Sequence, residues 1–145
     1  MKQTVPGRWI ERVLVTAAIL LYAAVVPFLE INATHVLNPE WPGHARLHEV
    51  WQILTNSTIG MLCLWKLWRH GDLRLPIAVS LLILGGFLLA WLTQDLYGGS
   101  MQLAAEHPER RVLGVNLGVL GAFGGIACLV AAWGLDRWRR VSAGQ

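Results

Sequence analysis

The chain has 145 residues, of which 54% are hydrophobic and only 14% charged, with a formal net charge of +3. Soluble domains carry about 25% charged residues, so this composition argues against a water-soluble domain and for a membrane protein. Basic residues and aromatic residues do not alternate along a stripe, which argues against nucleic acid as a partner. The two cysteines, Cys63 and Cys128, lie in apolar segments outside any CxxC motif, so we interpret them as small buried side chains.

Four segments contain no charged residue at all: 13–29, 50–65, 75–94 and 112–135. A bilayer core of about 30 Å requires roughly 20 helical residues, and only helices satisfy their own backbone groups in lipid. The sequence therefore predicts an all-α, polytopic membrane protein, one domain over residues 1–145 folded as a bundle of four transmembrane helices. We expect the spans at about 10–30, 47–68, 74–96 and 111–135.

The basic residues are distributed unevenly around these spans. Nine of the 12 Lys and Arg residues lie at the two termini or in the connection between the second and third spans. The positive-inside rule then places both termini in the cytoplasm, for a multi-pass protein of the cell (inner) membrane. The first span ends at Pro27-Phe28-Leu29-Glu30 without a small-x-small cleavage site, so we expect it to be retained.

The ionisable residues on the opposite side come from four segments that are distant in sequence. Glu30 ends the first span and Asp95 ends the third, while the remaining members are His35, Glu40, His44, His48, Glu49 and His107. Ionisable residues at membrane depth are rare and usually functional, although Glu30, Glu49 or Asp95 could instead form structural clamps with Arg46, Arg110 or Arg111. We expect His35 and His107 to be the histidines most exposed to solvent.

Polar residues also recur along the second span. At about 100° per residue, His48, Glu49, Gln52, Thr55, Asn56 and Cys63 fall within an arc of about 120°. Because polar groups in lipid are costly, this face should point into the bundle. We therefore predict one pocket at the outer end, with a polar mouth and an apolar floor, and with Gln52, Asn56, Trp91, Asn116, His35 and Trp41 as substrate-binding residues.

The fourth span carries a row of glycines at helical spacing: Gly114, Gly118, Gly121 and Gly125. Small residues on one face let two helix backbones approach closely. We expect this face to pack either within the bundle or across a homodimer.

Two kinds of chemistry fit the outer cluster. His44 and His48 are spaced i, i+4, and with Glu49, Asp95 or His35 they could bind a divalent metal such as Zn or Fe. Alternatively, a carboxylate in a partly dry pocket beside a histidine could transfer protons near neutral pH. Haem is disfavoured because only His48 lies securely within a span, and motifs for nucleophilic, phosphate or dinucleotide chemistry are absent from the sequence.

One stretch has a family likeness. The runs EINATH at 30–35, NPEWP at 38–42 and HARLH at 44–48, followed by Gln52, resemble a family of small four-helix membrane proteins without an assigned function, found in bacteria and fungi. More loosely, the architecture is similar to the sterol-isomerase-like and membrane terpene cyclase families, and to DoxX-like proteins in size. These looser resemblances imply a lipid-accessible bundle with acidic residues, and they match no motif residue by residue.

The leading interpretation is a membrane isomerase or cyclase that acts on an isoprenoid- or sterol-like molecule. In this interpretation Glu30, His48, Glu49 and Asp95 are catalytic. The alternatives are a proton-coupled transporter or ligand-binding membrane protein, a metal-binding membrane oxidoreductase, and an accessory subunit of a larger membrane enzyme. The sequence assigns no cofactor, and it leaves open a divalent metal with His44 and His48 as ligands.

Overall fold

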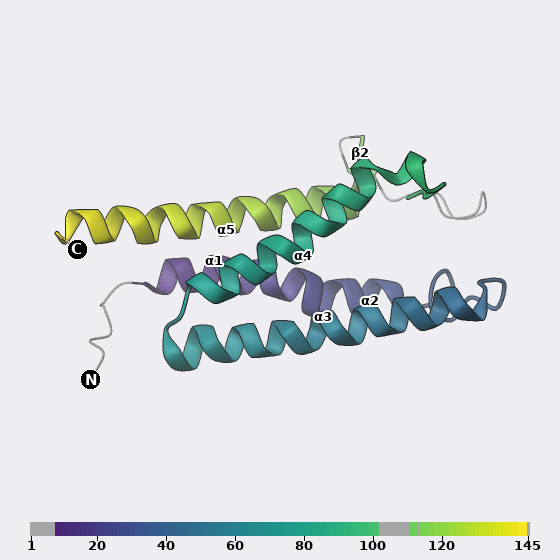
Figure 1. Cartoon of the computed structure of the whole chain (residues 1–145), viewed down its shortest axis with the longest axis horizontal. Coiled ribbons are helices and arrows are strands. Elements are labelled where there is room, and N and C mark those ends of the chain that lie inside the picture. Colours follow the sequence, from purple (N-terminus) through teal and green to yellow (C-terminus); the bar gives the residue numbers. More distant parts are fainter. Residues whose placement is uncertain (1–7, 102–110, 113, 145) are drawn as a thin grey trace.

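The computed structural model describes residues 8–101, 111–112 and 114–144, and these residues are mainly helical (Figure 1). The first helix is continuous from α1 (Trp9–Leu20) through a π-helical segment η1 (Leu21–Val25) to α2 (Val26–Glu30). It is followed by α3 (Gly43–His70), α4 (Arg74–Leu92), a 3₁₀ turn η2 (Gln94–Leu96) and α5 (Leu117–Ser142). Two short strands, β1 (Arg111–Val112) and β2 (Val115–Asn116), pair antiparallel before α5. The predicted all-α fold with four long helices is confirmed.

Three of these helices are long and apolar enough to cross a membrane: Trp9–Glu30, Arg74–Leu92 and Leu117–Ser142. Their outward faces carry large apolar side chains such as Phe28, which is 83% exposed, and Leu82, which is 76% exposed. Apolar surface of this extent is costly in water and suits the hydrocarbon of a bilayer. The chain is therefore a multi-pass membrane protein. The fourth long helix, α3, has 28 residues but a more polar sequence in its first half.

The connection between α3 and α4 is short and closely specified by the sequence. Gly71 ends α3 in the left-handed conformation, with φ of 66°, which glycine adopts without steric cost. The carboxylate of Asp72 then accepts hydrogen bonds from the backbone N–H of Arg74, at 3.0 Å, and of Leu75, at 3.4 Å. These bonds satisfy free backbone donors at the start of α4. The chain thus reverses direction within a short turn, and α3 and α4 are antiparallel neighbours.

The predicted limits of the last two spans need correction. The third helix ends at Leu92 rather than 96, because the chain tightens into the 3₁₀ turn over Gln94–Leu96. The fourth begins at Leu117 rather than 111, because residues before it form the strand pair and Gly114 turns with φ of 80°. Asn116 caps this helix by accepting hydrogen bonds from the backbone N–H groups of Gly118 and Val119.

The main core lies toward the end that carries both termini, here called the termini end. It contains buried side chains from all four long helices, among them Ile19, Leu67, Leu84 and Leu129. A smaller core of Leu88, Val119 and Ala122 joins only α4 and α5. In Figure 1, α4 runs diagonally, close to α3 near the termini and close to α5 at the opposite end. That opposite end is called the loop end below.

The row of glycines on the fourth helix packs inside the bundle. A methyl group added at Gly125 would lie 2.8 Å from Leu84 of α4, and one at Gly121 would lie 3.4 Å from Leu21. Gly114 is in the turn before α5 and outside the helix. Packing within the bundle, one of the two predicted arrangements, is therefore confirmed for Gly121 and Gly125, which contact the chain's own helices. A homodimer through Gly114, Gly118, Gly121 and Gly125 stays a prediction.

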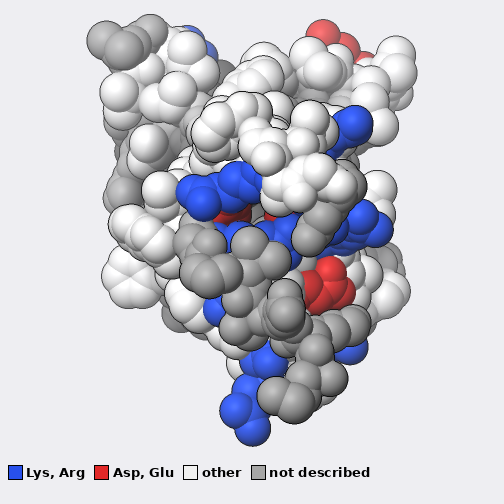
Figure 2. All heavy atoms as spheres, turned by 90° about the vertical axis from the view of Figure 1, so that its left-hand side faces the viewer, with Lys and Arg blue, Asp and Glu red and all other residues white. Residues whose placement is uncertain are grey.

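Charged residues gather at the termini end, where Figure 2 shows basic side chains surrounding acidic ones. Glu11 of α1 is fully buried, and its carboxylate lies 2.8 Å from Nε of Arg139 on α5. Asp136 forms ion pairs with Arg8 and, at 2.8 Å, with Arg140. These ion pairs join the start of α1 to the end of α5.

Candidate functional site

The clearest polar site at the loop end is a pair formed by Glu30 and His35. Glu30 is the last residue of α2, and the chain that follows folds back so that Nε2 of His35 lies 3.3 Å from Oε2 of Glu30. Both side chains are mostly buried, with 26% and 20% of their surface exposed. A carboxylate and an imidazole at this distance can share a proton.

The loop is shaped by Asn32, which follows Glu30 by two residues. Its side-chain nitrogen donates to the carbonyl of Leu29, and its Oδ1 accepts from the backbone N–H of Thr34 at 2.7 Å. The hydroxyl of Thr34 also donates to Oδ1, at 2.6 Å. Asparagine favours such turns because its side chain bonds to the backbone two residues further on. The turn places His35 beside Glu30.

The same bonds determine which nitrogen of His35 carries a fixed proton. The single hydrogen of the Thr34 hydroxyl is used by Asn32, so Thr34 Oγ1 can only accept from Nδ1 of His35, which lies 2.8 Å away. Nδ1 is therefore protonated, and Nε2, which faces Glu30, is the nitrogen that gains and loses a proton. If Glu30 were ionised and Nε2 of His35 carried no proton, the two groups would repel each other. The Glu30–His35 pair should therefore hold one proton, on Oε2 or on Nε2.

Two further residues complete this group, which we call the loop-end cluster: Glu30, His35, Trp41 and Glu49. Burial lowers the pKa of His35, and the nearby carboxylate of Glu49 acts in the opposite direction. Glu49 also lies close enough to Glu30 to interact with its charge. The ring of Trp41 meets His35 edge to face at a centroid distance of 5.6 Å. An aromatic wall thus lies against the imidazole, with two carboxylates nearby.

His48 lies outside this cluster. Its Nε2 is 3.0 Å from Nε2 of His44, and both rings are exposed on the surface of α3. Gln52 and Thr55 are exposed as well, whereas Glu49 and Asn56 are half-buried and Cys63 is buried. The prediction that all six polar residues face the interior is therefore wrong for His48, Gln52 and Thr55. Their side of α3 is turned away from the other helices.

Asp95 is also separated from the loop-end cluster. It lines a different cavity, of about 240 Å³, together with Trp91, Gln94, Gly99, Ser100, Met101 and Arg111. The end of α4 packs against α5 through Leu88, Val119 and Ala122, and Asp95 follows this end in the turn η2. In Figure 1 this end of α4 lies beside α5 and apart from the end of α2. The predicted single pocket is thus divided in two, with Glu30, His35, Trp41 and Glu49 in one group and Asp95 and Trp91 in the other.

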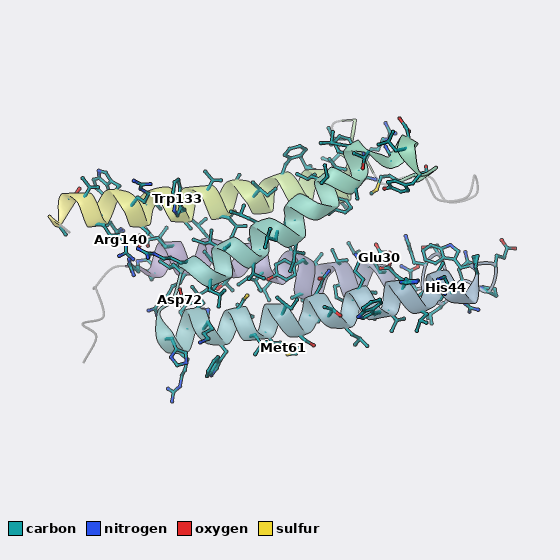
Figure 3. All side chains as sticks on the ribbon, viewed as in Figure 1. Glu30, His44, Met61, Asp72, Trp133 and Arg140 are labelled. Atoms are coloured by element: carbon teal, nitrogen blue, oxygen red, sulfur yellow. The ribbon has the colours of Figure 1, made fainter. Side chains whose placement is uncertain are left out.

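Two more predicted residues have defined positions. Asn116 holds the start of α5 through its capping bonds, so its side-chain oxygen is already engaged. Glu30 forms its ion pair with His35, whereas the predicted structural clamp paired it with Arg46, Arg110 or Arg111. Arg110 and His107 lie outside the described residues. Figure 3 shows Glu30 at the end of α2 and His44 further out, at the start of α3.

Several residues that the structure makes important lie outside the positions predicted from the sequence. Thr34 and Asn32 orient His35, and the spacing Asn-x-Thr after a helix end is a signal for such a turn. Glu11 and Asp136 are buried acidic residues within basic ends of the sequence. Their position among arginines gave a signal for ion pairing, because buried acidic groups are normally paired.

The described residues contain no group of three or more His, Cys, Asp and Glu side chains that could hold a metal ion. At the loop end, two pairs of described residues bring possible ligand atoms together: Nε2 of His44 and Nε2 of His48, 3.0 Å apart, and Oε2 of Glu30 and Nε2 of His35, 3.3 Å apart. Comparison with family models, with curated proteins and with solved structures found no match to this chain. The function is therefore argued from the site itself.

Proposed function

We propose that the protein is a membrane enzyme that moves a proton on a lipophilic substrate, as in double-bond isomerisation or proton-initiated cyclisation. The observation that carries the proposal is the Glu30–His35 pair, in which Oε2 and Nε2 lie 3.3 Å apart while Nδ1 lies 2.8 Å from Oγ1 of Thr34. A fixed tautomer presents the same nitrogen in every cycle, which is what general acid–base catalysis needs.

The chemistry can be written without a redox partner. The protonated pair gives its proton to one carbon of a double bond, which leaves a cation on the other carbon of that bond. A carboxylate then removes a proton from a carbon next to the cationic centre, and a new double bond forms there. The proton returns from this carboxylate to the pair, so the proton count is unchanged. Glu49 is the candidate for the second step, because it lies near both His35 and Glu30. In a partly dry site, such charges act more strongly than in water.

The surroundings of the cluster favour a lipophilic molecule. Large apolar side chains beside it in sequence are exposed, including Phe28, Ile31, Leu37 and Leu47. Trp41 adds an aromatic face against His35. A substrate dissolved in the bilayer could therefore reach the pair over apolar surface, without passing through water.

This proposal revises the roles suggested by the sequence. Glu30 and Glu49 keep catalytic roles, and His35 takes the place given to His48, which faces away. Trp41 keeps a substrate-binding role. Asp95 and Trp91 line a separate cavity and are not needed for the proposed step.

The proposal includes four membrane spans. Helix α3 has 28 residues, which at 1.5 Å per residue makes about 42 Å, enough to cross a core of about 30 Å. Exposed apolar residues in the middle of this helix, such as Leu54, Met61 and Leu62, would contact lipid, and its first turns, with His44 and His48, would lie beyond the hydrocarbon core. By the positive-inside rule we place the termini end in the cytoplasm and the loop-end cluster on the outer side of the cell membrane.

The test is a lipid and isoprenoid profile, measured by mass spectrometry in cells that express each variant. We expect a product that depends on the wild-type protein and falls by about a hundredfold in Glu30→Gln and His35→Gln, because each variant removes the proton-transfer pair. Glu49→Gln should reduce it as well. Glu40→Gln is the matched control, since Glu40 is an exposed carboxylate of the same loop. Identical profiles for wild type and the three cluster variants would contradict the proposal.

A further inference from the structure

A second chemical site is present on the outer surface of α3, separate from the loop-end cluster. His44 and His48 lie one turn apart at the start of this helix, and both are exposed. Their Nε2 atoms face each other at 3.0 Å, with the ring planes inclined by 82° and the centroids 4.4 Å apart. Two possible metal-ligand atoms therefore lie side by side at the surface, near the start of α3 where Figure 3 labels His44.

The helix holds this geometry in place. His44 and His48 can lie on one helical face only if the helix begins by Gly43. Helix α3 does begin at Gly43, directly after Pro42. Proline in front of a helix fixes the entry of the chain because its φ is restricted. The ring of Trp51 lies 5.9 Å from the ring of His48 and limits its rotation. The pair is thus arranged before any ligand arrives, which reduces the entropic cost of binding.

We propose that His44 and His48 form a two-coordinate protein site for a tetragonal divalent ion, Cu²⁺ or Ni²⁺. With metal–nitrogen bonds of about 2.0–2.1 Å, two nitrogens 3.0 Å apart subtend an angle of about 90° at the metal. This is the angle between neighbouring ligands in square-planar and octahedral ions. A tetrahedral zinc site would place its nitrogens about 3.3–3.4 Å apart, and imidazole ligands bind Cu²⁺ more tightly than Zn²⁺ in the Irving–Williams order, so we expect Cu²⁺ to bind first.

Both histidines are exposed, and the proposed span leaves the first turns of α3 beyond the hydrocarbon core, so the remaining coordination positions are open to water. The ion is therefore exchangeable, and the site is suited to capturing or sensing metal rather than to burying it. The site uses neither Glu30 nor His35 and does not depend on the proposed acid–base function. A result on one proposal leaves the other unaffected.

The experiment is a calorimetric titration of the full-length, detergent-purified chain with CuCl₂, NiCl₂ and ZnCl₂, combined with electron paramagnetic resonance of the Cu²⁺ complex. The variants are His44→Ala, His48→Ala and the double variant. His70→Ala is the matched control, since His70 is an exposed histidine at the other end of α3. Thermal melting of each variant shows whether it is folded, which exposed positions should allow.

We expect one Cu²⁺ per chain with hyperfine coupling to two nitrogens, and tighter binding of Cu²⁺ than of Ni²⁺ or Zn²⁺. Each single alanine variant should weaken Cu²⁺ binding by about a hundredfold, because the second imidazole acts as a linked intramolecular ligand. His70→Ala should bind as the wild type does. If the double variant binds Cu²⁺ as tightly as the wild type, or Zn²⁺ binds more tightly than Cu²⁺, the proposal is wrong and the two imidazoles only share a hydrogen bond.

Discussion

At the scale of single residues, His35 differs from an ordinary surface histidine because both of its ring nitrogens contact other protein groups. Nδ1 bonds to Thr34 and Nε2 faces Glu30. Burial lowers the pKa of the ring below its usual 6.5, and Glu49 raises it. The imidazole should therefore stay neutral at pH 6.5 and become charged only as the pH falls through its lowered pKa.

A pH titration by ¹⁵N NMR of histidine-labelled protein would measure this. We expect the His35 signals to show the Nδ1–H tautomer and a midpoint below 6.5. In the Glu49→Gln variant the midpoint should fall further, because that variant removes the charge that favours the imidazolium. Glu40→Gln, which changes an exposed carboxylate of the loop, should leave it unchanged. A midpoint at or above 6.5 in the wild type would contradict the lowered pKa of His35.

The sequence could identify Glu30 and Glu49 as polar groups at membrane depth, because charge is rare in apolar segments. It could not show that His35, in a loop without helical spacing, would fold back onto Glu30. That contact depends on the turn at Asn32, whose side chain bonds to Leu29 and Thr34. Periodicity describes helices, so it carries no information about such a loop.

At the scale of elements, α3 shows why polarity alone gave the wrong face. The residues that pack inward, or partly inward, are spaced by four and three: Glu49, Ile53, Asn56, Gly60, Cys63 and Leu67. On a helical wheel this face is turned by about 60° from the centre of the predicted polar arc. Three of its six residues are apolar or lack a side chain. A face defined by polar residues alone is therefore centred too close to His48 and Gln52.

Gly60 gives that inward face its closest approach to another helix. A methyl group added there would lie 2.4 Å from the Cβ of Ala23, in the π-helical segment of the first helix. Beside this contact, the hydroxyl of Ser57 donates to the carbonyl of Ala23 at 3.0 Å. The wide π turn is thus accommodated by a small residue and a hydroxyl donor on α3.

Gly60→Ala should therefore destabilise the protein by about 1–3 kcal/mol, because the two backbones cannot separate without loss of packing. The measurement is the free energy of unfolding by SDS in mixed micelles. Gly86→Ala is the control: it lies in α4 with no atom within 4 Å of the added methyl group, and alanine should gain up to about 1 kcal/mol there. Equal effects of the two substitutions would show that the contact with Ala23 has no influence on stability.

At the scale of the whole molecule, the diagonal course of α4 decides how many sites there are. The sequence places Glu30 and Asp95 at the same end of the bundle, and four helices of similar length suggested one shared pocket. The structure packs α4 against α3 near the termini and against α5 at the loop end. The angle at which two helices cross depends on how their side chains fit together. The first and last residues of a predicted span carry no information about that fit.

The ion pairs at the termini end should hold this arrangement together, because they join the first helix to the last. Glu11 is fully buried and depends on Arg139, which is about one-third exposed. Glu11→Gln keeps the size of the side chain and removes its charge, so it leaves Arg139 without its partner. We expect a loss of about 2–3 kcal/mol in the free energy of unfolding, below the largest losses seen for buried pairs, since Arg139 can still reach water.

The same SDS titration would measure this loss. Arg69→Gln is the matched control, because Arg69 is an exposed basic residue at the same end, and it should change stability by no more than about 0.5 kcal/mol. Adding Arg139→Gln to Glu11→Gln should cost less than the sum of the two single losses, since the second change removes an already unpaired charge. Strict additivity, or a Glu11→Gln loss no larger than that of Arg69→Gln, would show that the Glu11–Arg139 pair does not help to hold the first and last helices together.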